Sequence, residues 1–329
     1  MTLLGSSGSG KSTIMKQMDI IYQGGISEKN RYQQLVYENI YSAIADVVQH
    51  MNQNQYWSNF KYKGYENIAN KIVSEWNCRA TMPDHVGIVI EEIWSDSFVR
   101  SLVNLGKFVF SCDSSEYFLN NISRIGHPSY CPSDEDIIRG WCTSTGIYTQ
   151  TFNIKSAQVE VIDTSGARSE RRKWRHCFQP GMLVVFCVAL TDYSQRLSED
   201  KSASRMTDSL QLFKDIANSK ELLESSMIII FTKADHLRER IEKTPLSHSF
   251  VDYTGEDTFE AALSYIANRY LSLVVSRTKP IYTYVVDATN TEDVRSTFSE
   301  VYVEYMITSF RFENKEQSFH NRTILEHVQ

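Results

Sequence analysis

The sequence from Gly5 to Ser12 reads Gly-Ser-Ser-Gly-Ser-Gly-Lys-Ser and satisfies the phosphate-loop pattern G-x-x-x-x-G-K-[ST] in full. Residues 2–4 before it are long enough only for a strand stub, and Ile14, Met18 and Ile21 follow it at helical spacing. This pattern requires a strand, a glycine-rich loop and a helix, because backbone N–H groups then surround phosphate oxygens at the start of the helix. The alternative is a chance match in a flexible Gly/Ser loop.

The pattern also assigns roles within the loop. Lys11 supplies a point charge to the outer phosphates, and the hydroxyl of Ser12 binds Mg²⁺. We therefore predict that the phosphates are held by Gly5, Ser6, Ser7, Gly8, Ser9, Gly10, Lys11, Ser12 and Thr13.

A second motif, Asp163-Thr-Ser-Gly166, follows the apolar strand predicted at residues 159–162. An aspartate at the end of a strand can hold Mg²⁺ through a water molecule, and a glycine three residues later can offer its backbone N–H to a terminal phosphate. The alternative is an ordinary turn after a strand. Because this motif lies downstream of a phosphate loop, we predict that Asp163 and Gly166 belong to the same site.

A third motif, Thr232-Lys233-Ala234-Asp235, directly follows a predicted buried strand at residues 227–231. A carboxylate can accept two hydrogen bonds from N1 and the exocyclic amine of guanine, whereas adenine has no such donor pair. Asp235 therefore predicts selection of guanine; the alternative is a surface turn with a helix-capping aspartate. After the last predicted strand, we expect the backbone N–H of Ala288 to reach the guanine oxygen O6.

Composition limits the class of protein. The chain has 329 residues, 42% hydrophobic and 22% charged, with 6 Pro and 14 Gly, so it can bury a core and is neither disordered nor fibrous. A net charge of −6 argues against binding nucleic acid through a general basic surface. Six scattered cysteines without CxxC pairs fit a reducing cytosol. The longest apolar run, residues 182–190, is too short for a transmembrane segment.

Hydrophobic periodicity divides the chain into two kinds of structure. A long amphipathic helix is predicted at residues 28–51, and shorter helical patterns follow at 65–76, 85–94, 98–105 and 115–125. Predicted strands at 148–152, 159–162, 183–189, 227–231 and 281–286 include three that alternate with helical patterns at 204–218 and 257–275. We therefore predict an α/β domain with a mainly parallel sheet, residues 1–27 and 139–329, interrupted by an all-helical domain at residues 28–138.

The order of these motifs resembles the α-subunit of a heterotrimeric G protein over nearly the whole chain. The closest stretches are Thr13–Met18, Asp113–Leu119, Arg168–Trp174, His176–Phe178 and Phe186–Leu190. The resemblance implies a Ras-like GTPase domain with an inserted helical domain, binding GTP or GDP with Mg²⁺. It implies nucleotide contacts from Asp113, Ser114, Ile138, Arg139, Asp163, Gly166, Thr232, Lys233, Asp235 and Ala288, and Mg²⁺ ligation by Ser12, Ser144 and, through water, Asp163.

Two catalytic positions depart from the family. Its first switch carries an arginine three residues before the Mg²⁺ ligand, where this chain has Trp141, and its second switch reads Asp-Val-Gly-Gly-Gln, where this chain ends in Ala167. An indole cannot stabilise the charge of a transferring phosphoryl group, and alanine cannot orient water. Arg139 matches an arginine that lacks the catalytic role in the family. We therefore expect slow hydrolysis, or a nucleotide-binding interaction protein without turnover.

Smaller departures affect the nucleotide pocket. Gly8 replaces an acidic residue, so we expect a more flexible loop, and Thr232 replaces asparagine, which shortens a bracing side chain. Asp287 replaces a small thiol and brings a negative charge near the base. Asp208 replaces a glutamate that pairs with a second-switch arginine such as Arg171. A third interpretation, a phosphate-loop kinase or ATPase, would require adenine recognition.

The resemblance also implies partners. It places a Gβγ dimer on Arg168–Trp174, a receptor on the C-terminal helix predicted at 291–312, and an effector, with the protein at the inner face of the plasma membrane. The family's N-terminal arm has no counterpart here, and Thr2 after Met1 leaves no N-myristoylation signal. Either the protein lacks the anchor or the sequence is truncated, and we favour truncation. About thirteen residues, 317–329, extend past the family's usual end.

Overall fold

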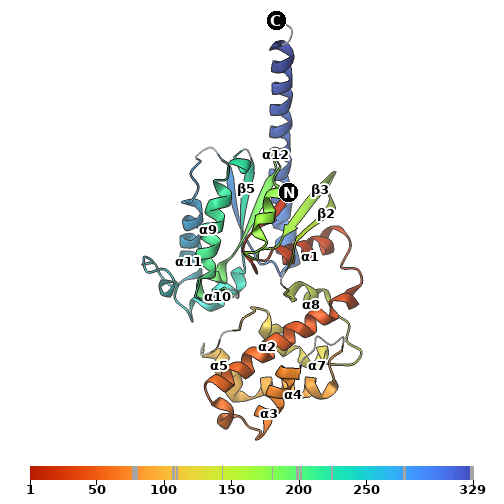
Figure 1. The fold of residues 1–329 in the computed structure, drawn as a ribbon, viewed down its shortest axis with the longest axis vertical. Helices are drawn as coiled ribbons and strands as arrows, with labels where there is room; N and C mark the ends of the chain where they lie inside the picture. Colours follow the sequence, from red (N-terminus) through yellow and green to blue (C-terminus); the bar gives the residue numbers. More distant parts are fainter. Residues whose placement is uncertain are drawn as a thin grey trace. The chain divides into compact units, whose positions relative to one another are not determined.

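The structure is a computed structural model that describes residues 1–75, 81–105, 108, 110–142, 144–179, 181–197, 200, 202–223, 225–276 and 279–326, with side chains up to residue 309. The predicted helix at residues 65–76 therefore ends outside the described residues. The chain separates into two compact units (Figure 1). We call Met1–Gly24 together with Thr143–Gln329 the sheet unit, and Gly25–Cys142 the helical unit.

The sheet unit is built on six strands in the order β2-β3-β1-β4-β5-β6. The strands are β1 (Thr2–Leu4), β2 (Ile147–Ile154), β3 (Ala157–Thr164), β4 (Leu183–Ala189), β5 (Ser226–Thr232) and β6 (Ile281–Val286). All neighbouring pairs are parallel except the β2–β3 hairpin. The predicted α/β class with a mainly parallel sheet is thus confirmed.

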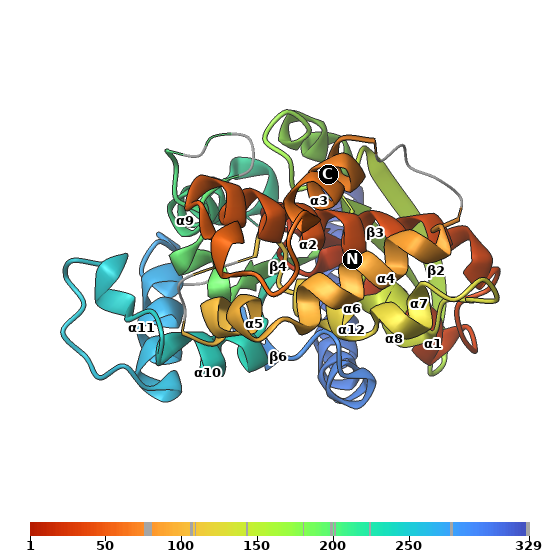
Figure 2. The same ribbon diagram turned by 90° about the horizontal axis from the view of Figure 1, so that it is seen from below.

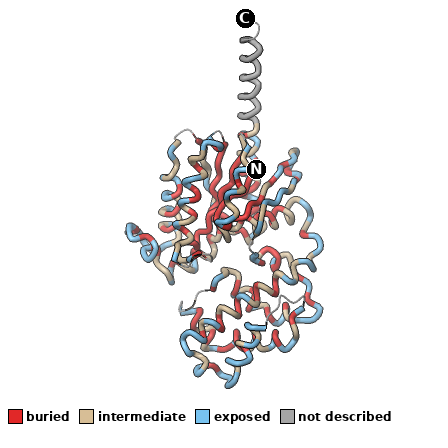
Figure 3. The backbone as a smooth tube through the Cα atoms, viewed as in Figure 1, coloured by how far each residue is buried: buried red, intermediate tan, exposed pale blue. Residues whose placement is uncertain are grey.

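Helices cover both faces of this sheet, which explains why β4 and β5 are buried along their whole length (Figure 3). The helices are α1 (Lys11–Tyr22), α9 (Arg205–Ala217), α10 (Ala234–Ile241), α11 (Phe259–Leu271) and α12 (Thr291–Glu326). Alternate residues of β4 face opposite layers: Val184 and Phe186 pack with α9 and α11, whereas Val185 and Cys187 pack with α1 and α12. Short 3-10 turns lie at Arg171–Cys177, Leu190–Ser194, Lys220–Leu222 and Leu246–His248.

The C-terminal helix is longer than predicted. Its backbone continues to Glu326, whereas the sequence pattern indicated an end near residue 312. Residues 313–326 contain neither glycine nor proline, so no residue in this stretch strongly opposes helix propagation. No helix among the described residues combines the length and apolarity needed to cross a membrane.

The helical unit packs around one central helix (Figure 2). Its helices are α2 (Gln33–Gln53), α3 (Tyr65–Glu75), α4 (Asp84–Ser95), α5 (Ser97–Asn104), α6 (Ser115–Asn120), α7 (Ile122–Ile125) and α8 (Asp134–Arg139), with 3-10 turns at Lys29–Tyr32 and Tyr56–Asn59. The buried stripe of α2 recurs every three or four residues, as predicted. The predicted helix at 115–125 is divided at Asn121, whose side chain donates to the carbonyl of Tyr117 over 2.9 Å.

A buried carboxylate anchors the end of the helical unit that leads back to the sheet. Asp136, in the first turn of α8, accepts hydrogen bonds from Arg124 (2.7 and 2.8 Å), Tyr117 (2.8 Å) and Tyr130 (3.0 Å) and completes a capping box with Ser133. Burial alone would raise the pKa of Asp136, but the hydrogen bonds from Arg124 and Ser133 outweigh it and hold the pKa well below its usual range. This network fixes α8, whose last residues were predicted to contact nucleotide.

In the sheet unit, Lys279 is a buried cation. Its Nζ donates to the carbonyl oxygens of Ala217, at the end of α9, and Leu222, over 3.1 and 2.8 Å. Burial lowers the pKa of Lys279 from 10.5 to about 8. Between these two pH values the unfolded chain holds this proton and the folded chain has released it.

We therefore expect the free energy of unfolding to rise with pH through this window, because the penalty of the lowered pKa is complete below about pH 8 and is lost by pH 10.5. The shift corresponds to at most about 3 kcal/mol. Chemical denaturation of the unmodified chain and of Lys279→Met at several pH values from 8 to 10.5 measures it. The unfolding free energy of the unmodified chain minus that of Lys279→Met should rise with pH over this range, and a constant value of this difference would contradict the burial argument.

Candidate nucleotide site

The phosphate loop connects β1 to α1 at the carboxyl end of the central strand. Lys11 lies under it with its side chain buried, and Nζ donates to the carbonyl oxygens of Gly5 and Ser6 (2.8 Å each) and to Oγ of Ser9 (3.3 Å). Burial lowers the pKa of Lys11, opposed by the nearby carboxylate of Asp163. The loop's own oxygens thus hold a cation in place beneath backbone N–H groups, the arrangement that an anionic phosphate requires.

Three oxygen-bearing side chains meet beside the loop. Oγ of Ser12 donates to Oδ2 of Asp163 over 2.8 Å and lies 2.9 Å from Oγ of Ser144. The second carboxylate oxygen, Oδ1 of Asp163, is buried and has no hydrogen-bond partner within the part of the chain that the structure describes. Burial raises the pKa of Asp163, opposed by the charge of Lys11.

This donor set fits Mg²⁺, which prefers hard oxygen ligands and is commonly held by one or two carboxylates together with substrate phosphates. A cation beside Asp163 would pair with this Oδ1 atom. Among the described residues no group of three or more His, Cys, Asp or Glu side chains forms another candidate metal centre.

The second-switch segment, which we define as Asp163–Trp174, lies directly against the loop. A Cβ added to Gly166 would lie 2.4 Å from the backbone of Ser6 and Ser7, so only glycine allows this approach. Ala167 follows with its side chain largely buried and its N–H 3.4 Å from Oγ of Ser165. The side chain at this position is a methyl group only.

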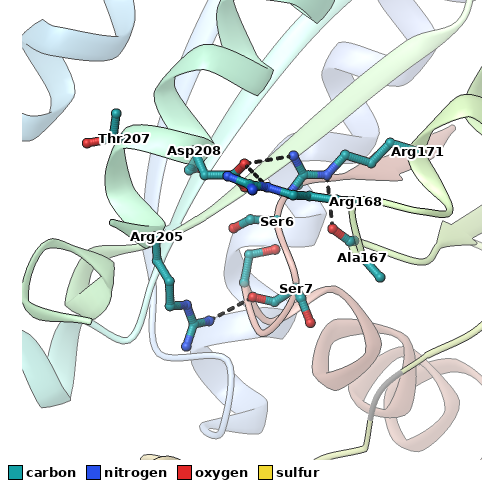
Figure 4. Close-up of polar contacts among 12 residues, drawn as sticks. Ser6, Ser7, Ala167, Arg168, Arg171, Arg205, Thr207 and Asp208 are labelled. Atoms are coloured by element: carbon teal, nitrogen blue, oxygen red, sulfur yellow. Dashed lines mark hydrogen bonds and ion pairs between the residues drawn. The ribbon is translucent and has the colours of Figure 1, made fainter. Parts of the chain in front are cut away.

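Two arginines of the second switch converge on α9 (Figure 4). Arg171 donates to Asp208 over 2.5 and 3.1 Å, which matches the expected pair, and Nε of Arg168 donates to the same carboxylate over 2.9 Å. Burial would raise the pKa of Asp208, but both arginines outweigh it and lower the pKa. The indole of Trp174 is buried and donates to the carbonyl of Ser165 over 2.9 Å. The second switch is therefore folded onto α9.

Arg205 braces the phosphate loop from the first residue of α9. Its Nη2 donates to the carbonyl of Ser7 over 2.7 Å (Figure 4). Its Nε lies 3.0 Å from Oδ1 of Asp192. Gly8 leaves room for this guanidinium: its φ is +73°, and a Cβ there would lie 2.5 Å from Nη2 of Arg205. The loop expected to be flexible at Gly8 is thus supported by an arginine that occupies the space of the missing side chain.

We expect Arg205→Ala to raise the dissociation rate of bound guanine nucleotide by about tenfold, because a charge-assisted hydrogen bond to the loop is lost. Displacement of a fluorescent GDP analogue measures this rate. Arg238→Ala is the matched control, since Arg238 is exposed, forms a 3.7 Å ion pair with Glu260 and lies over the ring of Phe259. If both variants release nucleotide at the rate of the unmodified chain, Arg205 does not support the loop.

The predicted base-recognition residues lie at the same edge of the sheet as the loop. Thr232 ends β5 and its hydroxyl contacts the carbonyls of Ser9 (3.0 Å) and Val188 (3.3 Å), so the shorter side chain still braces the loop. Lys233 adopts a left-handed conformation, φ +60°, and Asp235 follows in the first turn of α10. The side chain of Asp235 is partly exposed, with Oδ2 3.6 Å from Nε2 of His236.

The loop after β6 completes this edge. The carbonyl of Ala288 accepts a hydrogen bond from the buried side chain of Gln17 over 3.1 Å, which ties the loop to α1. Oδ1 of Asp287 accepts from the N–H (2.8 Å) and the hydroxyl (2.7 Å) of Thr289. Oδ1 of Asp287 is therefore hydrogen-bonded within its own turn.

The remaining predicted residues belong to the helical unit: Asp113, Ser114, Ile138, Arg139 and Trp141. Ser114 precedes α6, and Arg139 ends α8, where it pairs with Glu135 over 3.1 Å and lies 4.8 Å from the ring centre of Tyr117. Their contacts with a nucleotide remain predictions.

Trp141 is held by its backbone and leaves its indole 44% exposed. Its N–H donates to Oδ1 of Asn39 over 3.0 Å, and its carbonyl accepts from Nδ2 of the same residue over 2.8 Å. Asn39 therefore fixes the chain at the position where the family carries its catalytic arginine.

Sequence patterns missed Arg205, Asn39 and the hydroxyl of Ser165. Arg205 is 198 positions from its partner Ser7, and Asn39 is 102 positions from Trp141, so no local spacing connects them. Ser165 offered a signal, because it stands at a family glycine.

Comparisons with known proteins agree with this geometry. A family model described as G-protein alpha subunit matches residues 1–305. The guanine nucleotide-binding protein alpha-1 subunit of Neurospora crassa is 35% identical over 306 residues, 92% of this chain and 86% of the relative. The guanine nucleotide-binding protein alpha subunits of Colletotrichum trifolii and Cryphonectria parasitica are each 34% identical over 304 residues, with the same coverage.

Proposed function

Because this chain belongs to the family of G-protein alpha subunits, we propose that it is a GTP/GDP switch of a heterotrimeric G protein whose own GTP hydrolysis is slow. Guanine-nucleotide binding and a GTPase reaction follow from the family. The slow rate rests on one observation: an intact phosphate loop and cation site beside Ala167, which carries only a methyl group.

Binding and positioning of phosphates are retained in this proposal. The N–H groups of residues 5–12 and the ammonium of Lys11 hold the β- and γ-phosphates, and Gly166 presents its N–H to the terminal phosphate. Ser12, Ser144 and, through water, Asp163 would hold Mg²⁺, which would supply positive charge to the β- and γ-phosphates.

The chemical step lacks two contributions. In alpha subunits and their relatives, from which this magnitude is taken, the arginine is worth about 10³–10⁵ in rate, or roughly 4–7 kcal/mol of barrier. Trp141 supplies no charge at that position, and Ala167 neither donates nor accepts a hydrogen bond to an attacking water. Arg139 does not replace the missing arginine, because its guanidinium pairs with Glu135 and stacks on Tyr117.

The proposed partners follow from the family and from two surfaces. A Gβγ dimer would bind the basic second-switch stretch Arg168–Trp174, and a receptor would bind the C-terminal helix α12. Signalling to an effector, from the inner face of the plasma membrane, completes the proposal. A second candidate, an interaction protein that binds nucleotide without turnover, is favoured by the same Trp141 and Ala167.

Nucleotide competition tests the binding half of the proposal. With Mg²⁺ present, GTP and GDP should displace a fluorescent GDP analogue at least about 100-fold better than ATP, because only guanine offers two donors to Asp235. Equal displacement by ATP would instead support an ATPase or kinase. The hydrolysis half is tested by the rate measurement that closes the Discussion.

A further inference from the structure

Ser165 connects the second switch to the segment around Ser144 and Gly146, which we call the first switch. It is 1% exposed, and its Oγ donates to the carbonyl of Ser144 over 2.6 Å. The glycine that stands at this position in the family pattern has no such hydroxyl. The bond therefore comes from a departure of this chain, and it ends on the backbone of the residue whose hydroxyl lies 2.9 Å from Ser12.

Two hydrogen bonds donated by backbone N–H groups extend the same connection. The N–H of Ser165 donates to the carbonyl of Gly146 over 3.0 Å, and the N–H of Gly146 donates to Oε2 of Glu170, also over 3.0 Å. Ser144 and Gly146 are thus held to the second switch by three hydrogen bonds between protein groups. None of the three involves a nucleotide.

The second switch is itself fixed at Ser165. The carbonyl of Ser165 accepts the indole N–H of buried Trp174 over 2.9 Å, and farther along the segment Arg171 donates to the carbonyl of Gly166 over 3.1 Å. The serine therefore contacts the first switch through its hydroxyl and N–H, and the second switch through its carbonyl.

These hydrogen bonds reduce how much the terminal phosphate is needed to order the two switches. In GTPase switches the two segments are ordered by the γ-phosphate and Mg²⁺ and are released on hydrolysis. We call the arrangement in which the two switches lie against each other closed. A hydroxyl that binds the first switch directly favours this closed arrangement in both nucleotide states. A ligand shifts such an equilibrium only by its differential affinity for the two arrangements, so added closed-state stability reduces the change that hydrolysis produces.

We propose that Ser165 is a positioning residue that holds Ser144 beside Ser12 whether GDP or GTP is bound. The inference rests on the proposed function, since it assumes that the chain binds guanine nucleotides and Mg²⁺. Its consequence is a first switch that stays ordered in the GDP state.

Hydrogen exchange of the full chain tests this at the amide of Gly146. This amide donates to Glu170 of the second switch, so its protection reports whether the first switch stays against the second. The protein is measured with GDP and with a non-hydrolysable GTP analogue, each with Mg²⁺, as the unmodified chain, Ser165→Gly, Ser165→Thr and Ser225→Ala. Ser225 is the matched control, because it is a buried serine of the same unit whose hydroxyl has no hydrogen-bond partner among the described residues.

We expect exchange at Gly146 in the unmodified chain to differ by less than about threefold between the two nucleotides. Loss of one hydrogen bond in Ser165→Gly should raise exchange in the GDP state by roughly five- to tenfold. Mg²⁺ affinity of the GDP complex should fall by a similar factor. Ser165→Thr, which keeps the hydroxyl, and Ser225→Ala should behave like the unmodified chain.

The proposal is overturned if Ser165→Gly leaves both exchange and Mg²⁺ affinity unchanged, or if the unmodified chain already releases Gly146 on binding GDP. Nucleotide binding is measured in the same samples. A chain that binds neither nucleotide contradicts the proposed function instead, so the two failures are distinguished.

Discussion

The double variant Trp141→Arg with Ala167→Gln should hydrolyse GTP about 10³-fold faster than the unmodified chain in a single turnover. The arginine restores positive charge for the transferring phosphoryl group, and in this family that contribution alone is worth about 10³–10⁵. The glutamine restores a group that can orient water. The variant leaves the proposed phosphate and cation ligands Lys11, Ser12 and Asp163 unchanged.

The single variants and a neutral control separate the two contributions. Trp141→Leu removes the indole without adding charge and should leave the rate within about threefold, since an uncharged group contributes little to electrostatic stabilisation. Each single restoration should give less than the double variant, because the two groups act on the same transition state. A double variant that binds GTP but gains no rate would show that the two missing groups do not limit hydrolysis.

Asp235→Asn should weaken GTP binding by at least about 10²-fold, because the amide cannot accept both donors of guanine. The same variant should gain affinity for xanthosine triphosphate, whose second oxygen can accept a hydrogen bond from the new amide. Competition against a fluorescent nucleotide measures both affinities.

Asp287→Asn is the matched control for this experiment. Its carboxylate lies on the loop after β6 but binds the N–H and hydroxyl of Thr289. We therefore expect less than about a threefold change in GTP affinity from Asp287→Asn, a change typical of a group bound within its own turn. Equal losses from the two variants would contradict the role given to Asp235.

Local sequence predicted those parts of the fold that depend on local chemistry. The buried strands β4 and β5 are continuous apolar runs, and the phosphate loop carries its own pattern. The three-residue strand β1 shows how much the motif contributed: three apolar or neutral residues would not predict a central strand without the glycine-rich loop that follows.

The missed features depend on contacts between distant segments. Arg205 supports the loop only because α9 begins beside Ser7, and the hydroxyl of Ser165 matters only because Ser144 lies within 2.6 Å. Hydrogen-bond partners of this kind are set by tertiary packing, which a single sequence does not specify. The extension of α12 to Glu326 differs from the predicted end near residue 312, because the resemblance to the family indicates only the family's usual end and says nothing of the residues beyond it.

Single-turnover hydrolysis of [γ-³²P]GTP by the unmodified chain, with Mg²⁺ present, tests the central claim most directly. Alpha subunits that carry their arginine hydrolyse GTP at about 10⁻² s⁻¹, and removal of a contribution of about 10³ or more predicts a rate of about 10⁻⁵ s⁻¹ or below. Phosphate release near that lower value, from protein that binds GTP with full stoichiometry, is the result we predict. Release at about 10⁻² s⁻¹ would contradict the account, because Trp141 and Ala167 would then not limit catalysis.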